Sequence, residues 1–201
     1  MRTIVIGCTV AGTTLLLAAC SSSGIPSTSR GIAPFTATAS GAFPDAGSNV
    51  IKNPCFNTGK LPPWLSIGKS PGQGKISKTE VYSACKYSAF AGTTKPPAVD
   101  KLHGVSQKVT IPKNGVLTWW YWGDSNDSIK YADDEVDLVS GGKIVYMCFK
   151  KLITTKKWTK GTCNLSKYAG KAYDLTLGVY DNGYTKTYIY WYVDDVSLSG
   201  S

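Results

Sequence analysis

The sequence predicts an all-β fold, an antiparallel jelly-roll β-sandwich, and three observations support this. Short segments rich in aromatic and β-branched residues recur along the chain, and such residues favour strands over helices. Turns containing Gly, Pro and Asn separate these segments at the short intervals that are typical of sandwiches and barrels. The sequence also lacks the 3.6-residue apolar period of an amphipathic helix.

The strands follow from alternation and from the turn residues between them. Alternation is clearest at residues 104–112, and a Ser-Gly-Gly turn at 140–142 predicts a hairpin. In chain order, the sequence predicts strands within residues 50–59, 61–67, 104–112, 116–122, 134–139, 143–149, 158–165, 173–180 and 187–198, with one helical turn at 166–171.

The first 19 residues have the pattern of an export signal. Arg2 supplies positive charge, an apolar run follows, and small residues precede Cys20. The run is too short for a transmembrane helix. The segment Leu17-Ala18-Ala19-Cys20 resembles the lipobox of bacterial lipoproteins, which implies cleavage before Cys20 and attachment of lipid to it. The alternative is an ordinary cleaved signal with an incidental cysteine.

Residues 20–48 predict a flexible tether, because they are rich in Ser, Thr, Ala, Gly and Pro and have no apolar period. Residues 49–201 then predict one β-sandwich domain, which is long enough to bury a core. We therefore expect an exported protein that is lipid-anchored to the bacterial cell envelope, with the domain held away from the membrane. No pattern predicts an oligomeric state.

Export places the cysteines in an oxidising compartment, where they form disulfides. Cys8 leaves with the signal and Cys20 is reserved for lipid, so four cysteines remain, and four allow three connectivities. We predict the bridges Cys55–Cys85 and Cys148–Cys163, the second between neighbouring antiparallel strands. A zinc site is not indicated, because no C-x-x-C spacing occurs and His103 is the only histidine.

The acidic residues do not indicate an enzyme. A glycosidase needs two carboxylates that flank a cleft, and acidic residues do gather between residues 124 and 137. Alternation places Glu135 and Asp137 opposite Val136 and Leu138, however, so a solvated polar face explains them. His103 has no nucleophile motif near it. We therefore expect a non-catalytic protein, and a hydrolase is the least favoured alternative.

The chain has a formal net charge of +9, and its lysines cluster between residues 150 and 171. Because this cluster contains no Arg, we do not expect binding to nucleic acid. Two interpretations remain. The lysines either protect exposed sheet edges from aggregation, or they contact an acidic polysaccharide or another anionic polymer of the envelope.

Aromatic residues alternate along two of the predicted strands. Trp120 and Trp122 have the parity opposite to Leu117, which we expect to be buried, so they should face outward. Tyr190 and Tyr192 on the last strand extend this set. Exposed rings of this kind suggest a binding platform, and we predict that these four residues bind ligand. The alternative is that loops bury both faces.

The order of the motifs is more specific than any one of them. An opening Asn53, Phe56 and Gly59 precede Trp64, and the strand at 105–112 and the aromatic segment 117–122 follow, before the motifs at 164–171 and 193–198. This order resembles jelly-roll domains of secreted bacterial proteins, related to galactose-binding-like and carbohydrate-binding modules. The resemblance implies binding of carbohydrate or glycoconjugate. The alternative is a structural or adhesive surface lipoprotein that binds other proteins.

The resemblance also implies one cofactor, a structural Ca²⁺. In relatives, the opening segment and the closing Asp pair can hold this ion, and the matching residues here are Asn53, Asn57, Asp194 and Asp195. Asn57 stands where family members often have an acidic residue. Its carbonyl oxygen can still bind a hard cation, but without the charge. The alternative is that Asp194 and Asp195 cap backbone amides with no ion.

Overall fold

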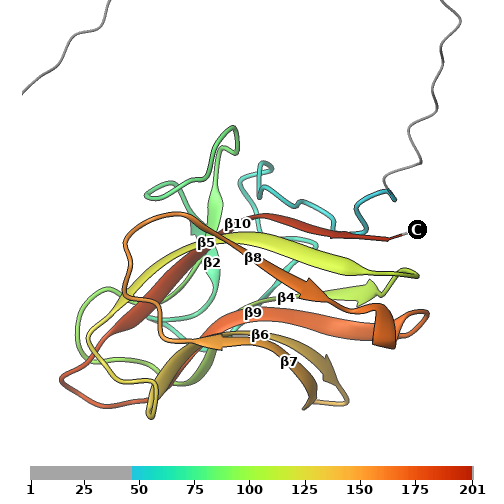
Figure 1. Ribbon diagram of the computed structural model, residues 1–201. Helices are drawn as coiled ribbons and strands as arrows, with labels where there is room; N and C mark the ends of the chain where they lie inside the picture. The colour runs from blue at the N-terminus through green and yellow to red at the C-terminus, as the bar shows by residue number, and fades with distance from the viewer. Residues whose placement is uncertain (1–46, 201) are drawn as a thin grey trace, which may run out of the picture. The chain divides into compact units, whose positions relative to one another are not determined.

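The computed structural model describes residues 47–200, which form two five-stranded antiparallel sheets packed face to face (Figure 1). Sheet A has the strand order β1-β4-β9-β6-β7, and sheet B has the order β2-β3-β10-β5-β8. From β3 onward the chain crosses repeatedly between the two sheets, as in a jelly roll. The predicted antiparallel β-sandwich is therefore confirmed.

The strands agree with the predicted segments from residue 100 onward. Their bounds are β1 Leu65–Ile67, β2 Lys75–Ser77, β3 Ser88–Thr93, β4 Asp100–Thr110, β5 Val116–Ser125, β6 Ala132–Ser140, β7 Lys143–Lys151, β8 Thr159–Asn164, β9 Ala172–Asn182 and β10 Ile189–Ser199. The helical turn predicted at 166–171 is the 3-10 helix η1, Ser166–Tyr168. No helix within residues 47–200 is long and apolar enough to cross a membrane.

The core lies between the sheets and is built from one parity of each strand. Leu117 and Trp119 of β5 and Leu175 and Leu177 of β9 are completely buried there. The intervening residues of these strands face away from the core, because successive side chains of a strand point to opposite faces. Each sheet therefore presents a second, outer face, and both outer faces are candidates for a binding site.

Strand β10 is the central strand of sheet B and contains a bulge. It pairs with β3 on one side and β5 on the other, and its register with β5 shifts between Asp194 and Ser197. Asp195, with φ 45°, is the extra residue of this bulge. As a result Val193 and Val196 both face the core, although they differ in parity. The even residues before the bulge face outward.

The opening segment differs from its prediction, because residues 50–59 form no strand. Asn53 and Phe56 both have φ 51°, and Pro54 lies between them, which interrupts an extended conformation. The segment is instead fixed to β10 from its start. Val50 N–H donates to Leu198 O at 2.9 Å, and the Asn49 amide bonds to the backbone of Val196 and Leu198.

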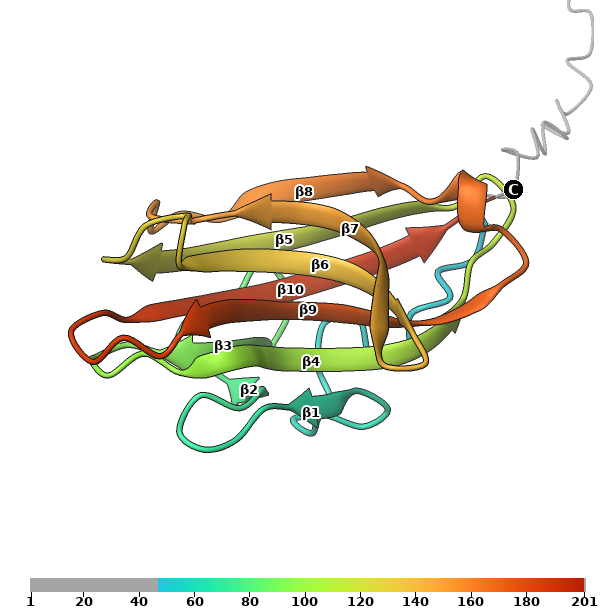
Figure 2. The same ribbon diagram turned by 90° about the horizontal axis from the view of Figure 1, so that it is seen from below.

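Both predicted disulfides, Cys55–Cys85 and Cys148–Cys163, are confirmed. The expectation that Cys148 and Cys163 lie on neighbouring strands of one sheet is wrong. Cys148 lies on β7 at the edge of sheet A, whereas Cys163 lies on β8 at the edge of sheet B. In Figure 2 these two strands run side by side along one edge of the sandwich. The bridge therefore joins the two sheets.

The predicted signal peptide, Cys20 and most of the predicted tether lie outside the described residues. Export, lipidation and anchoring therefore remain predictions.

Candidate functional site

Aromatic side chains gather on the outer face of sheet B and form what we call the aromatic face. Neighbouring rings contact one another with centroid distances from 4.0 to 6.1 Å. The four predicted ligand-binding residues all belong to this face. Its members are Tyr82, Phe90, Trp120, Trp122, Trp158, Tyr188, Tyr190 and Tyr192.

The centre of the aromatic face is a row of packed rings that includes Trp122. Tyr192 is the cross-strand partner of both Trp122 and Phe90, which aligns the three rings across β5, β10 and β3. Tyr190 and Tyr192 are only 9% and 5% exposed. Trp122 remains half-buried, with its ring 6.0 Å from Tyr190 and 5.5 Å from Tyr192. The two tyrosine rings are thus almost buried, and the neighbouring Trp122 offers ring surface to solvent.

Trp120 faces outward but is partly covered by a loop. The ring of Tyr82 stacks on it at a centroid distance of 4.0 Å and an angle of 16°. This loop is held in place from β10, because Tyr82 N–H donates to Asp194 Oδ2 at 3.0 Å. Trp120 therefore already has an aromatic partner. Trp122, Trp158 and Tyr188 are the half-buried rings at the outer side of the cluster.

A charged group lies at one end of the aromatic face. The buried carboxylate of Asp124, beside Tyr190 across the ladder, accepts a hydrogen bond from Tyr188 Oη at 2.9 Å and pairs with Lys156 Nζ at 2.9 Å. The hydrogen bond to Asp124 is the main cause that raises the pKa of Tyr188. Ring surface and hydrogen-bonding groups thus lie next to each other.

Sequence analysis missed half of this face. Tyr82, Phe90, Trp158 and Tyr188 are not among the predicted binding residues; three of them contact predicted residues, and Trp158 contacts Tyr82. Phe90 and Tyr188 have the outward parity of their strands, so alternation could have indicated them. Tyr82 and Trp158 lie on loops, where alternation gives no signal.

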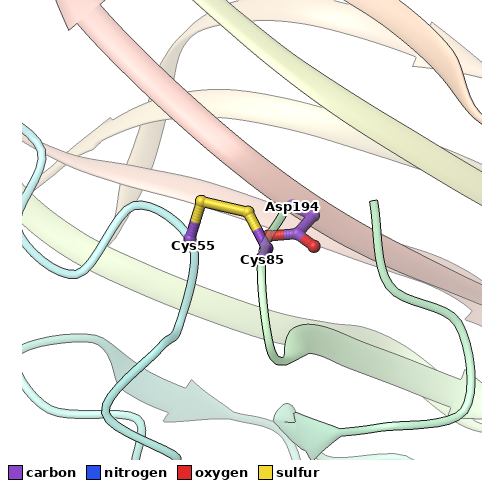
Figure 3. Close-up of side chains that lie close together, drawn as sticks. All are labelled: Cys55, Cys85 and Asp194. Carbon is purple, nitrogen blue, oxygen red and sulfur yellow. A yellow bond between two sulfur atoms is a disulfide. The ribbon is translucent and has the colours of Figure 1, made fainter. Parts of the chain in front are cut away.

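The residues predicted for calcium lie around the Cys55–Cys85 bridge. Figure 3 shows the Asp194 carboxyl group beside this disulfide. Among the His, Cys, Asp and Glu side chains of residues 47–200, a sulfur of each cysteine and an oxygen of Asp194 form the only group of three ligand atoms that lie within 4.8 Å of one another. Both sulfurs are committed to the disulfide, so they are not available as thiolate ligands.

The oxygen atoms of these residues are directed at backbone N–H groups. Asp194 accepts hydrogen bonds from Tyr82 N and Asp195 N, and Asn57 Oδ1 accepts one from Lys86 N at 2.6 Å. Asp194 is fully buried, and burial raises its pKa to about 7, against the lowering effect of the two N–H donors. This geometry favours amide capping. Calcium at Asn53, Asn57, Asp194 and the exposed Asp195 stays a prediction.

The outer face of sheet A is acidic. Asp133, Glu135 and Asp137 of β6 point to it, as alternation predicts, but they are 2%, 4% and 0% exposed rather than solvated. Burial is the first cause that raises the pKa of Glu135 to about 8, and the neighbouring carboxylates add to it. Burial also raises the pKa of Asp137 to about 6, against the lowering effect of its hydrogen bond with Glu135. Lys150 Nζ pairs with Asp133 at 3.0 Å.

Small residues lie beside these carboxylates. Glu135 is opposite Gly178 of β9, and Asp137 is opposite Thr176. Tyr180, 39% exposed, is opposite Asp133 at one end of the row. Polar groups, little side-chain bulk and one exposed ring make this face a second candidate surface for a polar ligand.

His103 is buried, and lysines of the cluster lie on the edge strands of the two sheets. His103 is 6% exposed, and its Nδ1 lies 3.2 Å from the carbonyl oxygen of Lys101. Lys150, Lys151 and Lys160 lie on β7 and β8, which are the edge strands of the two sheets. This placement agrees with protection of exposed edges.

Comparison with solved structures shows the class of fold. TmCBM61, a carbohydrate-binding module in complex with β-1,4-galactotriose, is 19% identical, and the match covers 77% of this chain and 99% of that chain with a TM-score of 0.53. The CBM22-1 xylan-binding domain from Paenibacillus barcinonensis Xyn10C is 18% identical, with coverages of 77% and 95% and a TM-score of 0.50. The fold is thus the β-sandwich found in carbohydrate-binding modules.

No protein-family model matches the sequence, and no curated protein matches it. At these identities, the structural likeness establishes the fold alone.

Proposed function

We propose that this protein is a non-catalytic binding module for carbohydrate or glycoconjugate. The main observation is the aromatic face, where half-buried Trp122 packs beside the rings of Tyr190 and Tyr192, near the charged group of Asp124 and Lys156. Sugars bind through stacking of their C–H faces on aromatic rings and through hydrogen bonds from their hydroxyls to such charged groups. Trp122, with Trp158 and Tyr188, supplies the stacking surface, and Tyr190 and Tyr192 support it.

The fold supports this proposal, because two solved structures with the same sandwich are named as a galactotriose-bound module and a xylan-binding domain. The charges around the aromatic face favour an acidic glycan or another anionic envelope polymer. The Lys156 side chain is 60% exposed, and Lys75 Nζ lies 5.0 Å from the centroid of Phe90. A negatively charged polymer bound on the rings would therefore lie close to the positive charges of Lys156 and Lys75.

The test is a glycan array and titration of the full chain, with Trp122→Ala as the diagnostic variant. We expect this variant to lose roughly 5- to 150-fold in affinity, because stacking on one aromatic ring is worth about 1–3 kcal/mol. Tyr180→Ala is the matched control, since it removes an exposed ring from the other sheet. Unchanged binding in Trp122→Ala would contradict the proposed site.

The same two variants show which of the two outer faces binds the glycan. If Tyr180→Ala removes binding and Trp122→Ala does not, the glycan lies on the acidic face of sheet A. If the array is negative and the chain captures a protein from envelope extract through surfaces that neither variant alters, the adhesive alternative is favoured.

We further propose that the module is exported and anchored to the cell envelope by lipid at Cys20. The support is the Leu17-Ala18-Ala19-Cys20 segment, and two disulfides agree with an oxidising compartment. Labelled palmitate should be incorporated into the wild-type protein and not into Cys20→Ala. Equal labelling of both proteins would exclude the anchor.

A further inference from the structure

Two carboxylates meet at the end of the sandwich where β5 and β9 finish. Asp127 lies in the loop between β5 and β6, and Asp181 is the penultimate residue of β9. One oxygen of each is bonded within its own turn. Asp127 Oδ1 accepts Ser128 N–H at 2.6 Å, and Asp181 Oδ1 accepts Gly183 N–H at 2.7 Å. These bonds fix both carboxylates in place.

The second oxygen of each carboxylate has no visible partner. Asp127 Oδ2 and Asp181 Oδ2 are both shielded from solvent and make no hydrogen bond of regular geometry. The two carboxyl groups lie within hydrogen-bond reach of each other, and the Tyr184 backbone N–H also acts on Asp181. Asp181 is 0% exposed. The two groups are close, since Asp127 adds to the effect of burial in raising the pKa of Asp181 to about 6. An unpaired buried carboxylate oxygen is costly, so two of them together indicate an absent partner that is positively charged.

A cavity of about 630 Å³ opens at this place. Asp127 is part of its wall, and the other lining residues are Asn126, Ser128, Tyr131, Asn182, Tyr184 and Thr187. Amide and hydroxyl groups among them offer neutral oxygen atoms beside Asp127, and Asp181 lies directly before the lining residue Asn182. Two carboxylates completed by neutral oxygens and water are typical of Ca²⁺, which takes six to eight oxygen ligands in flexible geometry. The absence of sulfur and imidazole from the lining disfavours zinc and copper.

We propose that Asp127 and Asp181 bind a calcium ion that joins the loop after β5 to the turn after β9. The two carboxylates balance the charge of one Ca²⁺, and the ion satisfies both shielded Oδ2 atoms. This site is separate from the Asn53–Asn57 segment and Asp194, where the oxygens already accept N–H groups. It does not depend on whether the aromatic face binds a glycan.

The experiment uses the full chain after treatment with chelator and dialysis. Calcium is added alone, and the melting temperature and the heat of binding are measured. We expect one ion per chain and a rise in melting temperature of roughly 5 to 10 °C at a concentration about a hundredfold above Kd. Asp127→Asn should lose most of this rise, and Asp181→Asn should lose it as well.

Asp127 is on a loop, so its variant remains informative if Asp181→Asn does not fold. Asp195→Asn and Asn57→Ala are the controls, and both should keep the calcium response. The proposal is overturned if calcium changes neither the melting temperature nor the heat. It is also overturned if Asp127→Asn responds like the wild type, or if the response disappears in the Asp195 or Asn57 variant instead.

Discussion

At the scale of single residues, Trp119 and Trp122 show how strand parity separates packing from binding. Both belong to β5, yet Trp119 is completely buried between the sheets whereas Trp122 is half-buried on the aromatic face. The indole of Trp119 also meets Phe149 of the opposite sheet edge-on at 5.5 Å. The two side chains therefore serve different purposes, although they are only three positions apart.

The first prediction follows from this difference. Trp119→Ala should lower the free energy of unfolding by about 3–5 kcal/mol, because it leaves a cavity in a packed core. Trp122→Ala should lower it by roughly 1–2 kcal/mol, because part of this ring is already in water. Guanidinium unfolding of both variants and the wild type measures these changes. Equal losses would mean that Trp122 is a core residue, which would weaken the proposed platform.

The outward direction of Trp120 and Trp122 could be predicted from the sequence because Leu117 fixes the parity of β5. The stacking of Tyr82 on Trp120 could not be predicted from the sequence. Tyr82 reaches that ring only because Asp194, far away in sequence, holds its loop and because Cys85 is tied to Cys55. Such contacts depend on the three-dimensional path of loops, which residue alternation does not encode.

At the scale of elements, strand β6 departs most from its sequence pattern. Its polar residues alternate with apolar ones as on a solvated face, yet Asp133, Glu135 and Asp137 are buried. Strand β6 lies between β9 and β7, and its register with β7 shifts twice. A sequence pattern identifies the face to which a residue points, but not how closely neighbouring strands cover that face.

The second prediction concerns the pH dependence of stability. In the folded state the pKa of Glu135 is raised from 4.5 to about 8, so between these pH values the folded protein binds more protons than the unfolded chain. Stability should therefore be highest near the acidic end of this window and fall as pH rises towards 8. Burial is the first cause of this rise in the pKa of Glu135, and the neighbouring carboxylates Asp137 and Asp133 on β6 add to it, while Lys150 on β7 pairs with Asp133.

The measurement is the melting temperature of the wild type and Glu135→Gln between pH 5 and pH 8. The variant keeps the shape of the side chain and removes its charge, so its melting temperature should fall less across this range. The raised carboxyl group of Asp194, which does not interact with Glu135, acts equally in both proteins and cancels in the comparison, whereas the pKa of Asp137 changes together with Glu135. Parallel curves for the two proteins would show that Glu135 does not titrate in this window.

The long strands were the most predictable elements and the opening segment the least. Strands β4, β5, β9 and β10 each contain ten or eleven residues, and their alternation gives a strong signal. β2 has three residues and was not predicted. Residues 50–59 have the composition of a strand, but positive φ angles on either side of Pro54 turn them into a loop. Backbone conformations of this kind are not visible in hydrophobic patterns.

At the scale of the whole molecule, the Cys148–Cys163 bridge closes one side of the sandwich. It connects the edge strands of the two sheets, which share no backbone ladder. The sequence predicted the pairing because the two cysteines are close in the chain, but it did not show that the hairpin strand β7 and the following strand β8 lie in different sheets.

The third prediction is the contribution of this bridge to stability. Its cysteines are 15 residues apart, so the double variant Cys148→Ser and Cys163→Ser should be less stable by about 3 kcal/mol in the chain-entropy model. Denaturant unfolding under non-reducing conditions gives the value. The wild type in the presence of reductant and the Cys55→Ser and Cys85→Ser double variant serve as comparisons. A loss well under 1 kcal/mol would show that the packed sheets alone hold this edge.

The fixed opening segment has a mechanical consequence for a module that is pulled from its N-terminal side. Tension first loads the hydrogen bonds that Asn49 and Val50 make with Val196 and Leu198. If these rupture, only the residues from Gly47 to Cys55 can peel away, about eight positions or roughly 28 Å of extended chain. The force then passes through the Cys55–Cys85 bond and enters the chain just before β3, so the segment between the two cysteines, which contains β1 and β2, bears no load.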